Sequence, residues 1–178
     1  VCARCVREGS AAWLHSLRPL LASGTVRHGA CPELLSTLCA ARECSLLLLY
    51  VRHAADLDDE TLLPLLRLSL REIDGARDAA AAAAPAPTST DPAATAATAD
   101  DEAAGWGALL DALICAPRND VFLLQALRWL ALPDALLLLE RLVQLLLTYS
   151  SEWRAPQGSP SLSQLVGWLN VLLDAHAS

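Results

Sequence analysis

The sequence contains no lysine, so its thirteen arginines are the only side chains counted as positively charged at pH 7. Twenty acidic side chains outnumber them, which gives a formal net charge of −7 at pH 7 and a pI near 4.9. Surfaces that bind nucleic acids gather Lys and Arg together, because contacts with phosphate supply much of the affinity. Here the arginines are scattered along an acidic chain, so we expect it to make no direct contact with nucleic acid.

Methionine is also absent, and the chain begins at Val1. We therefore expect it to be a piece of a longer protein. The first residues lack the order of a secretory signal peptide, in which a basic segment is followed by an apolar segment and then by small residues. The sequence gives no reason to expect secretion.

An uninterrupted apolar run is missing too, although hydrophobic residues make up 54% of the chain and the mean hydropathy is +0.36. A membrane-spanning helix needs roughly 18 or more apolar residues with few charges. The candidate stretch, residues 122–147, is interrupted by polar and charged side chains, which are Gln125, Arg128, Asp134, Glu140, Arg141 and Gln144. We therefore expect no contact with a membrane.

Features that build catalytic sites are scarce. The chain has eight glycines and no Gly-rich loop of the kind that cradles phosphate after a strand. No pair of carboxylates at a useful spacing stands out, and no stretch alternates apolar and polar residues as a half-buried strand does. We therefore expect neither enzymatic activity, nor a cofactor, nor a small-molecule substrate.

The six cysteines do not form the framework of a small disulfide-rich protein, because a core this apolar does not need such cross-links. We expect them to be reduced. Cys39, Cys44 and Cys115 sit among leucines and are predicted to be small core residues.

A metal site is an open alternative near the beginning of the chain. Cys2 with Cys5, and His28 with Cys31, form two close pairs, and together they could supply the four tetrahedral ligands that zinc prefers. The segment between the pairs is Leu-rich and helical in pattern, unlike a tight zinc knuckle. We therefore predict no metal ion and keep a helical Cys/His zinc module as an alternative.

Low-complexity sequence divides the chain. Residues 79–105 are rich in Ala, Pro and Thr and contain no aromatic or large aliphatic side chain, so they predict a disordered linker. Residues 1–78 are expected to form an N-terminal helical half, and residues 106–178 a C-terminal helical half. We expect the two halves to pack on each other as one domain.

Helical periodicity is clearest in the second half, where Asn119 is a predicted N-cap. In the segment that starts at Pro133, the polar residues fall four positions apart and form one narrow polar stripe on the helix. The rest of its surface is apolar, so we expect this helix to be central. In the first half, Thr61 is the predicted N-cap of the last helix. Four tryptophans are predicted to lie in the core: Trp13, Trp106, Trp129 and Trp168.

The last helix has the strongest local signals. Ser161 and Gln164 form a capping box, and apolar side chains then recur at i, i+3, i+4 and i+7 as far as His176. Asp174 and His176 do not form a catalytic pair, because positions i and i+2 point about 200° apart on a helix. His176 lies in the last turn, where the helix dipole favours a positive charge.

These patterns predict an all-α fold, either an irregular helical bundle or a short α-solenoid of stacked helix pairs. The apolar surface is larger than an isolated set of short helices needs, so it is buried either between the two halves or against a partner. Our hypothesis for partner binding is the last helix, through six residues: Leu165, Trp168, Leu169, Leu172, Leu173 and His176.

The ending SLSQLVGWLNVLLDAHA, residues 161–177, resembles the C-terminal segment of the nucleolar protein 11 family. Weaker similarity lies in SLLLLYVRHAADLDDETLLPLL, residues 45–66, and in LLLLERLVQLLLTYS, residues 136–150. In that family a Trp, a Leu-rich turn and LLDAH close an all-helical C-terminal domain. The matching positions here are Trp168, Leu169, Leu172, Leu173, Asp174, Ala175 and His176.

The resemblance implies a non-enzymatic scaffold in the nucleolus, part of the UTP-A (t-UTP) module of the small-subunit processome. It implies that this helical part associates with the helical C-terminal domains of other processome subunits and supports pre-rRNA transcription and processing. It also implies that a part outside this sequence resembles a β-propeller. The alternative within the same broad class is an α-solenoid module of another large assembly, of the trafficking-coat or nuclear-pore type.

Overall fold

The computed structural model describes residues 11–26, 29, 31–53, 59–82, 93–151 and 158–177. Within these residues the regular elements are helices and no strand occurs, so the predicted all-α class is confirmed. The helices are α2 (Ala11–Ala22), α3 (Pro32–Ala40), α4 (Cys44–His53), α5 (Asp59–Ala82), α6 (Ala93–Cys115), α7 (Asp120–Arg128), α8 (Leu132–Ser151) and α9 (Leu162–His176).

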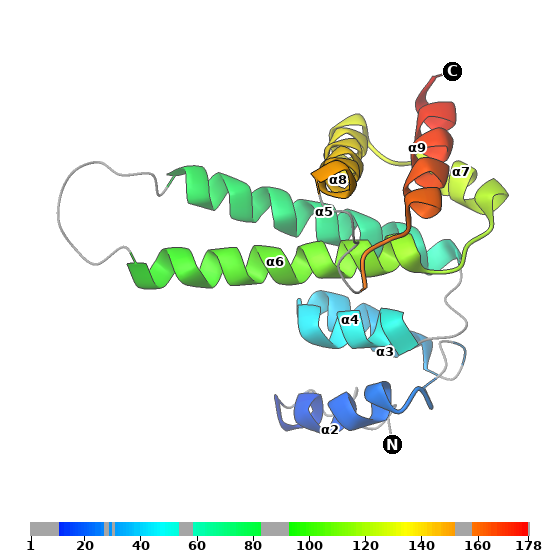
Figure 1. The fold of residues 1–178 in the computed structure, drawn as a ribbon. Helices are drawn as coiled ribbons and strands as arrows, with labels where there is room; N and C mark the ends of the chain where they lie inside the picture. Colours follow the sequence, from blue (N-terminus) through cyan, green and yellow to red (C-terminus); the bar gives the residue numbers. More distant parts are fainter. Residues whose placement is uncertain are drawn as a thin grey trace.

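The two longest helices form the middle of the molecule. In Figure 1, α5 and α6 lie side by side, with α2, α3 and α4 on one side of the pair and α7, α8 and α9 on the other. The α5–α6 pair therefore forms a middle layer between two groups of helices, α2–α4 and α7–α9, and within the first group α2 packs on α4. It also joins the two expected halves, since α5 comes from residues 1–78 and most of the packed part of α6 comes from residues 106–178.

Each face of the α5–α6 pair supports its own hydrophobic core. The first core lies against α2–α4 and contains Leu65 and Leu109, and the second lies against α7–α9 and contains Leu66 and Leu110. Neighbouring residues on one helix thus point into different cores. A helix that is apolar on opposite sides is expected at the centre of a fold, and here α5 and α6 occupy that place.

The prediction that the helix starting near Pro133 is central was wrong. That helix is α8, and it lies in an outer layer (Figure 1). It buries Leu138 and Leu142, whereas Leu136 and Leu147 are more than half exposed. The error has a physical origin, because a second apolar face produces the same sequence pattern whether it meets a neighbouring helix or solvent.

The predicted disordered linker, residues 79–105, also needs correction at both ends. Helix α5 continues through Ala82 and α6 starts at Ala93, so helix covers most of the stretch, and residues 83–92 lie outside the described residues. Alanine has the highest intrinsic helix propensity, which allows an Ala-rich segment to extend a helix that is packed elsewhere. The packing of α5 on α6 supports the prediction that the two halves form one domain, and this stays a prediction.

Several predicted helix ends can be checked directly. The Asn119 cap is confirmed, because its side chain accepts a hydrogen bond from the Val121 N–H at 3.0 Å. The Thr61 cap was wrong, since α5 begins two residues earlier and places Pro64 inside the helix.

Candidate partner-binding surface

Helix α9 is anchored to the end of α6 by hydrogen bonds to main-chain carbonyl groups. The indole Nε1 of Trp168 donates to the carbonyl of Ile114 at 3.1 Å, and the Gln164 Nε2 donates to the carbonyl of Cys115 at 3.0 Å. The last carbonyls of a helix lack partners within the helix, and these bonds supply partners for two of them; the Ile114 carbonyl also accepts from Arg118 at 3.4 Å. The same Gln164 forms the predicted capping box with Ser161, which is confirmed.

Three of the six predicted partner-binding residues belong to the second core. Leu165 and Trp168 are 0% exposed and Leu172 is 3% exposed, so they are covered by the protein's own helices. The hypothesis that these three side chains contact a partner is therefore corrected, because a partner would have to displace α9 to reach them. Their role is to fix α9 on the fold.

Arg118 completes this anchor and was not found from the sequence. Its guanidinium lies 5.0 Å from the centre of the Trp168 ring, its side chain is 10% exposed, and its Nε is 3.3 Å from the Asp120 carboxylate. Burial lowers the pKa of Arg118, and Asp120 opposes that shift. A Cβ atom added at Gly167 would come within 2.8 Å of the guanidinium, so the absence of a side chain there leaves room for it. A lone Arg after a helix gives no signal strong enough to predict this.

The other three predicted partner-binding residues remain accessible. Leu173 is 56% exposed, His176 is exposed and Leu169 is partly buried. Helix α9 extends through His176, so Asp174 and His176 stay on a continuous helix and do not face each other. Partner binding through Leu169, Leu173 and His176 stays a prediction.

The outward side of α9 carries apolar residues in the same arrangement as α8. The buried set Ala135, Leu138, Leu142 and Leu145 has the spacing of Leu165, Trp168, Leu172 and Ala175. Leu132, Leu136 and Val143 on α8 are exposed, and so are Leu162, Val166 and Leu173 at the corresponding positions of α9. Each helix therefore has one apolar face in the core and a second apolar face toward solvent.

Large exposed hydrophobic side chains are confined to one layer. Among the side chains that the structure describes, all of them lie on α7, α8, α9 or the residues joining α7 to α8: Val121, Phe122, Trp129, Leu132, Leu136, Val143, Leu147, Leu162, Val166 and Leu173. The prediction that Trp129 lies in the core was wrong, since it is 76% exposed, whereas Trp106 and Trp168 are buried as predicted. The side chain of Trp13 lies outside the described residues. An apolar surface of this extent is typical of an interaction site.

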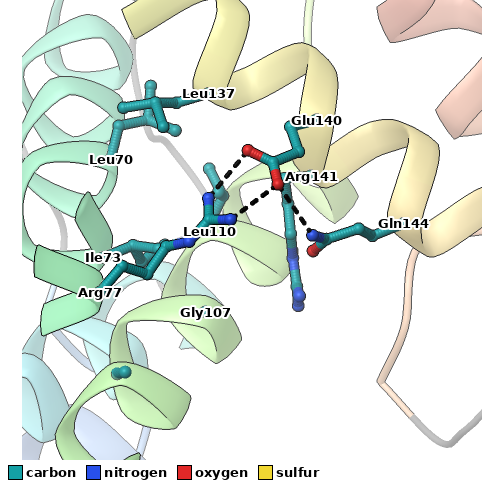
Figure 2. Close-up of a pocket in the computed structure, with 10 residues that line it drawn as sticks. Leu70, Ile73, Arg77, Gly107, Leu110, Leu137, Glu140, Arg141 and Gln144 are labelled. Atoms are coloured by element: carbon teal, nitrogen blue, oxygen red, sulfur yellow. Dashed lines mark hydrogen bonds and ion pairs between the residues drawn. The ribbon is translucent and has the colours of Figure 1, made fainter. Parts of the chain in front are cut away.

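Two ion pairs hold α8 on the middle layer. Arg77 of α5 donates to both oxygens of Glu140 at 2.8 Å, and Arg141 donates to Asp111 of α6 at 3.1 and 2.7 Å. Figure 2 shows the Glu140 carboxylate bonded directly to Arg77 at the edge of a cavity of about 140 Å³ between α5, α6 and α8, with the amide of Gln144 bonded to the same carboxylate. The hydrogen bond from Arg77 lowers the pKa of Glu140. Because each charge here has a partner, the arrangement indicates a structural clamp.

The suggested zinc ligands fall mostly outside the described residues. Cys2, Cys5 and His28 lie outside the described residues, and Cys31 is buried in the first core. No group of three or more His, Cys, Asp or Glu side chains in the described ranges is placed to hold a metal ion. Cys39 and Cys44 pack against the first core as small apolar residues, and Cys115 is partly buried.

The family comparison decides the identity of this fold. The description "Nucleolar protein 11 C-terminal domain" matches residues 8–178, nearly the whole chain. The chain belongs to this family. Comparison with individually curated proteins finds no match. A member of the nucleolar protein 11 family is a ribosome-biogenesis protein located in the nucleolus, as the resemblance of the final helix predicts.

The ending that resembles the nucleolar protein 11 family has two separate structural roles. Trp168, Leu172 and Ala175 are its buried positions, and Leu173 and His176 are its exposed positions. None of the described helices of this family member is long and apolar enough to cross a membrane.

The exposed apolar faces of α7–α9 form the candidate functional surface of this domain, because the large exposed hydrophobic side chains of the described residues gather there.

Proposed function

We propose that this nucleolar protein 11 domain is a non-enzymatic scaffold that binds the helical C-terminal domains of other small-subunit processome subunits. Through those contacts it supports pre-rRNA transcription and processing. The binding surface is the outward face of α9, formed by Leu162, Val166, Leu169, Leu173 and His176. It requires no cofactor, no small-molecule substrate and no direct contact with nucleic acid.

The observation that carries this proposal is the second apolar face of α9. Leu162, Val166 and Leu173 are 53%, 45% and 56% exposed on a helix whose opposite face is fixed in the core. Exposed apolar side chains in a row on a rigid helix match a surface onto which another helix packs. The helix is preorganised by its capping box and by the Trp168 anchor, so little ordering is needed on binding.

Charge and architecture favour a protein partner. The net charge of −7 opposes binding to a phosphate backbone, and every arginine that forms an ion pair within the described residues does so with a carboxylate of the same chain. The alternative of a regular α-solenoid module receives less support, because the described helices range from 9 to 24 residues and flank one long pair. Stacked repeats consist of similar helix pairs instead.

Co-purification from nucleoli tests the proposal. The affinity-tagged chain is compared with a Val166→Ser, Leu173→Ser variant, and the processome subunits recovered are quantified by mass spectrometry. We expect the variant to keep its thermal unfolding midpoint and to lose at least about tenfold of those subunits, because two apolar contacts are worth more than about 1.4 kcal/mol. Ser163→Ala, Asn170→Ala on the exposed polar part of α9 is the matched control. Equal recovery with both variants contradicts the proposal.

A deletion of α9 is a poor substitute for these point variants. Removing residues 159–178 would also remove Leu165, Trp168 and Leu172, which are at most 3% exposed. Loss of partners after such a deletion would follow from unfolding of the second core as readily as from loss of a docking surface.

A further inference from the structure

A second apolar surface runs along α8, on a different helix from the surface proposed above. Leu132, Leu136, Val143 and Leu147 are each between 42% and 63% exposed. With 3.6 residues per turn, their positions fall within about 60° of one another around the helix, along roughly 22 Å of its axis. They therefore form one straight row, and the partly buried Leu139 lies between Leu136 and Val143, which are seven positions apart.

Two exposed aromatic side chains precede this row in the sequence. Trp129 is three residues before Leu132, a distance of at most about 10 Å of chain, and it is 76% exposed. Phe122 is 52% exposed and lies seven residues before Trp129, which places it near the same side of α7. We call the set Phe122, Trp129, Leu132, Leu136, Val143 and Leu147 the α7–α8 ridge.

Shape and area suit a single helix as the occupant. Leu132, Leu136, Leu139 and Val143 follow one another at spacings of four, three and four, as in the apolar seam of a coiled coil. The six ridge side chains expose on the order of 600 Å², taking about 100 Å² for a half-exposed aliphatic chain and more for the aromatic rings. A standard interface hides about 800 Å² on each partner, so the ridge with its polar rim is sufficient for one docked helix.

Charge distinguishes between possible occupants. The ridge itself has no charged side chain, and Glu140 beside it is already bonded to Arg77. Arg128, next to Trp129, is exposed, and no carboxylate of the described residues forms an ion pair with it. Arg128, Trp129 and Gln125 together line an open depression of about 380 Å³. The apolar row on α8 thus begins four residues after an exposed cation, Arg128.

We infer that the α7–α8 ridge binds one amphipathic helix of a partner protein, about four turns long, with a carboxylate where it meets Arg128. Apolar residues of that helix at heptad spacing pack between Leu132 and Leu147. A second copy of this chain fits less well, because Asp120 and Glu140 beside its own ridge already pair with Arg118 and Arg77, and Asp134 is buried. This inference goes beyond the proposed function, which concerns α9 and other processome subunits.

A synthetic helix is the direct probe of the ridge. The probe is a 21-residue peptide with Leu at the two seam positions of each heptad, Ala and Gln elsewhere, and Glu in one terminal heptad. Versions with Glu at either end allow for both orientations, and matched peptides carry Lys in place of Glu. In calorimetric titrations of the whole chain, we expect one Glu peptide to bind about two- to fivefold more tightly than its Lys counterpart. Arg128→Glu should reverse that preference.

Ridge variants test where the peptide binds. Leu136→Ser, Val143→Ser should weaken binding of the Glu peptide by more than about tenfold, and both residues are exposed, so the fold should be kept. The matched control is Val166→Ser, Leu173→Ser on α9, which should leave the affinity unchanged. No binding of any peptide, or equal loss with both variants, would overturn the inference without affecting the α9 proposal.

Sedimentation velocity of the chain alone tests the competing occupant. We expect a monomer at concentrations up to about 100 µM, since an interface of this size without charge pairing is weak. A dimer that Leu136→Ser, Val143→Ser converts to a monomer would show that a second copy covers the ridge, and the inference would be wrong.

Discussion

The two outer layers of this nucleolar protein 11 domain differ in what they leave exposed. In the α2–α4 layer, none of the side chains that the structure describes is a large exposed hydrophobic, and Leu17, Leu34 and Leu47 are fully buried. The α7–α9 layer buries an equally apolar core but also exposes a second row of leucines and valines. Both layers contribute to the fold, and only the second has apolar surface left over for binding.

The largest effect that separates folding from binding is expected at Trp168. Trp168→Ala removes a fully buried ring and its hydrogen bond to Ile114, so it should lower the free energy of unfolding by about 3–5 kcal/mol. Trp129→Ala, which truncates a 76% exposed ring, should change it by less than about 0.5 kcal/mol. Urea denaturation of the two variants measures both values. Similar losses would mean that Trp129 is also a core residue.

A smaller effect is expected at the ion pair that ties α8 to α6. Arg141 and Asp111 are 30% and 16% exposed and share two hydrogen bonds, so Asp111→Ala should cost about 1–2 kcal/mol. The exchanged pair Asp111→Arg, Arg141→Asp should recover part of that stability. A double variant less stable than either single variant would show that the two side chains do not act as a pair.

The α9 capping box should contribute somewhat less. Ser161→Ala removes the hydroxyl that accepts from the Gln164 N–H, and such a change costs about 1 kcal/mol. The thermal unfolding midpoint should fall by about 2–4 °C for a chain of this size. Ser163→Ala, on the exposed side of the same helix, is the control and should not lower it.

The smallest predicted effect is a dependence on pH at Glu140. The hydrogen bond from Arg77 lowers the pKa of Glu140 in the folded protein, so this stabilisation is present above the unfolded value of about 4.3. It is lost as the pH falls through the folded value. Arg77→Ala should therefore reduce the unfolding midpoint at pH 7 and have less effect at pH 3. A constant difference across that range would contradict the assignment.

Local sequence signals predicted the start of two helices, α7 and α9, correctly. The Asn119 cap and the Ser161–Gln164 capping box depend on side chains within three residues, so no tertiary information is needed. The all-α class follows from periodicity for the same reason. The family resemblance rested on the ending around Trp168, which the structure uses as the anchor of α9.

The same local signals do not indicate which apolar residues of a helix face the core. Leu172 and Leu173 are adjacent leucines on one helix, yet one is 3% and the other 56% exposed. The helices packed against α9, which are α7 and α8 together with the end of α6, decide between them. The Arg118–Trp168 contact and the clamp between Arg77 and Glu140 join residues 50 or more positions apart, so they too depend on the tertiary fold.

Side-chain footprinting of the chain, free and within the complex isolated from nucleoli, tests the central claim most directly. Hydroxyl-radical labelling reports the solvent accessibility of each side chain. We predict that protection on assembly falls on the α7–α9 layer, at Leu173 of α9 and at Trp129 and Leu136 of the ridge, while exposed residues of α2–α4 keep their labelling. Protection confined to α2–α4, with Trp129 and Leu173 unchanged, would contradict the assignment of the α7–α9 layer as the binding side.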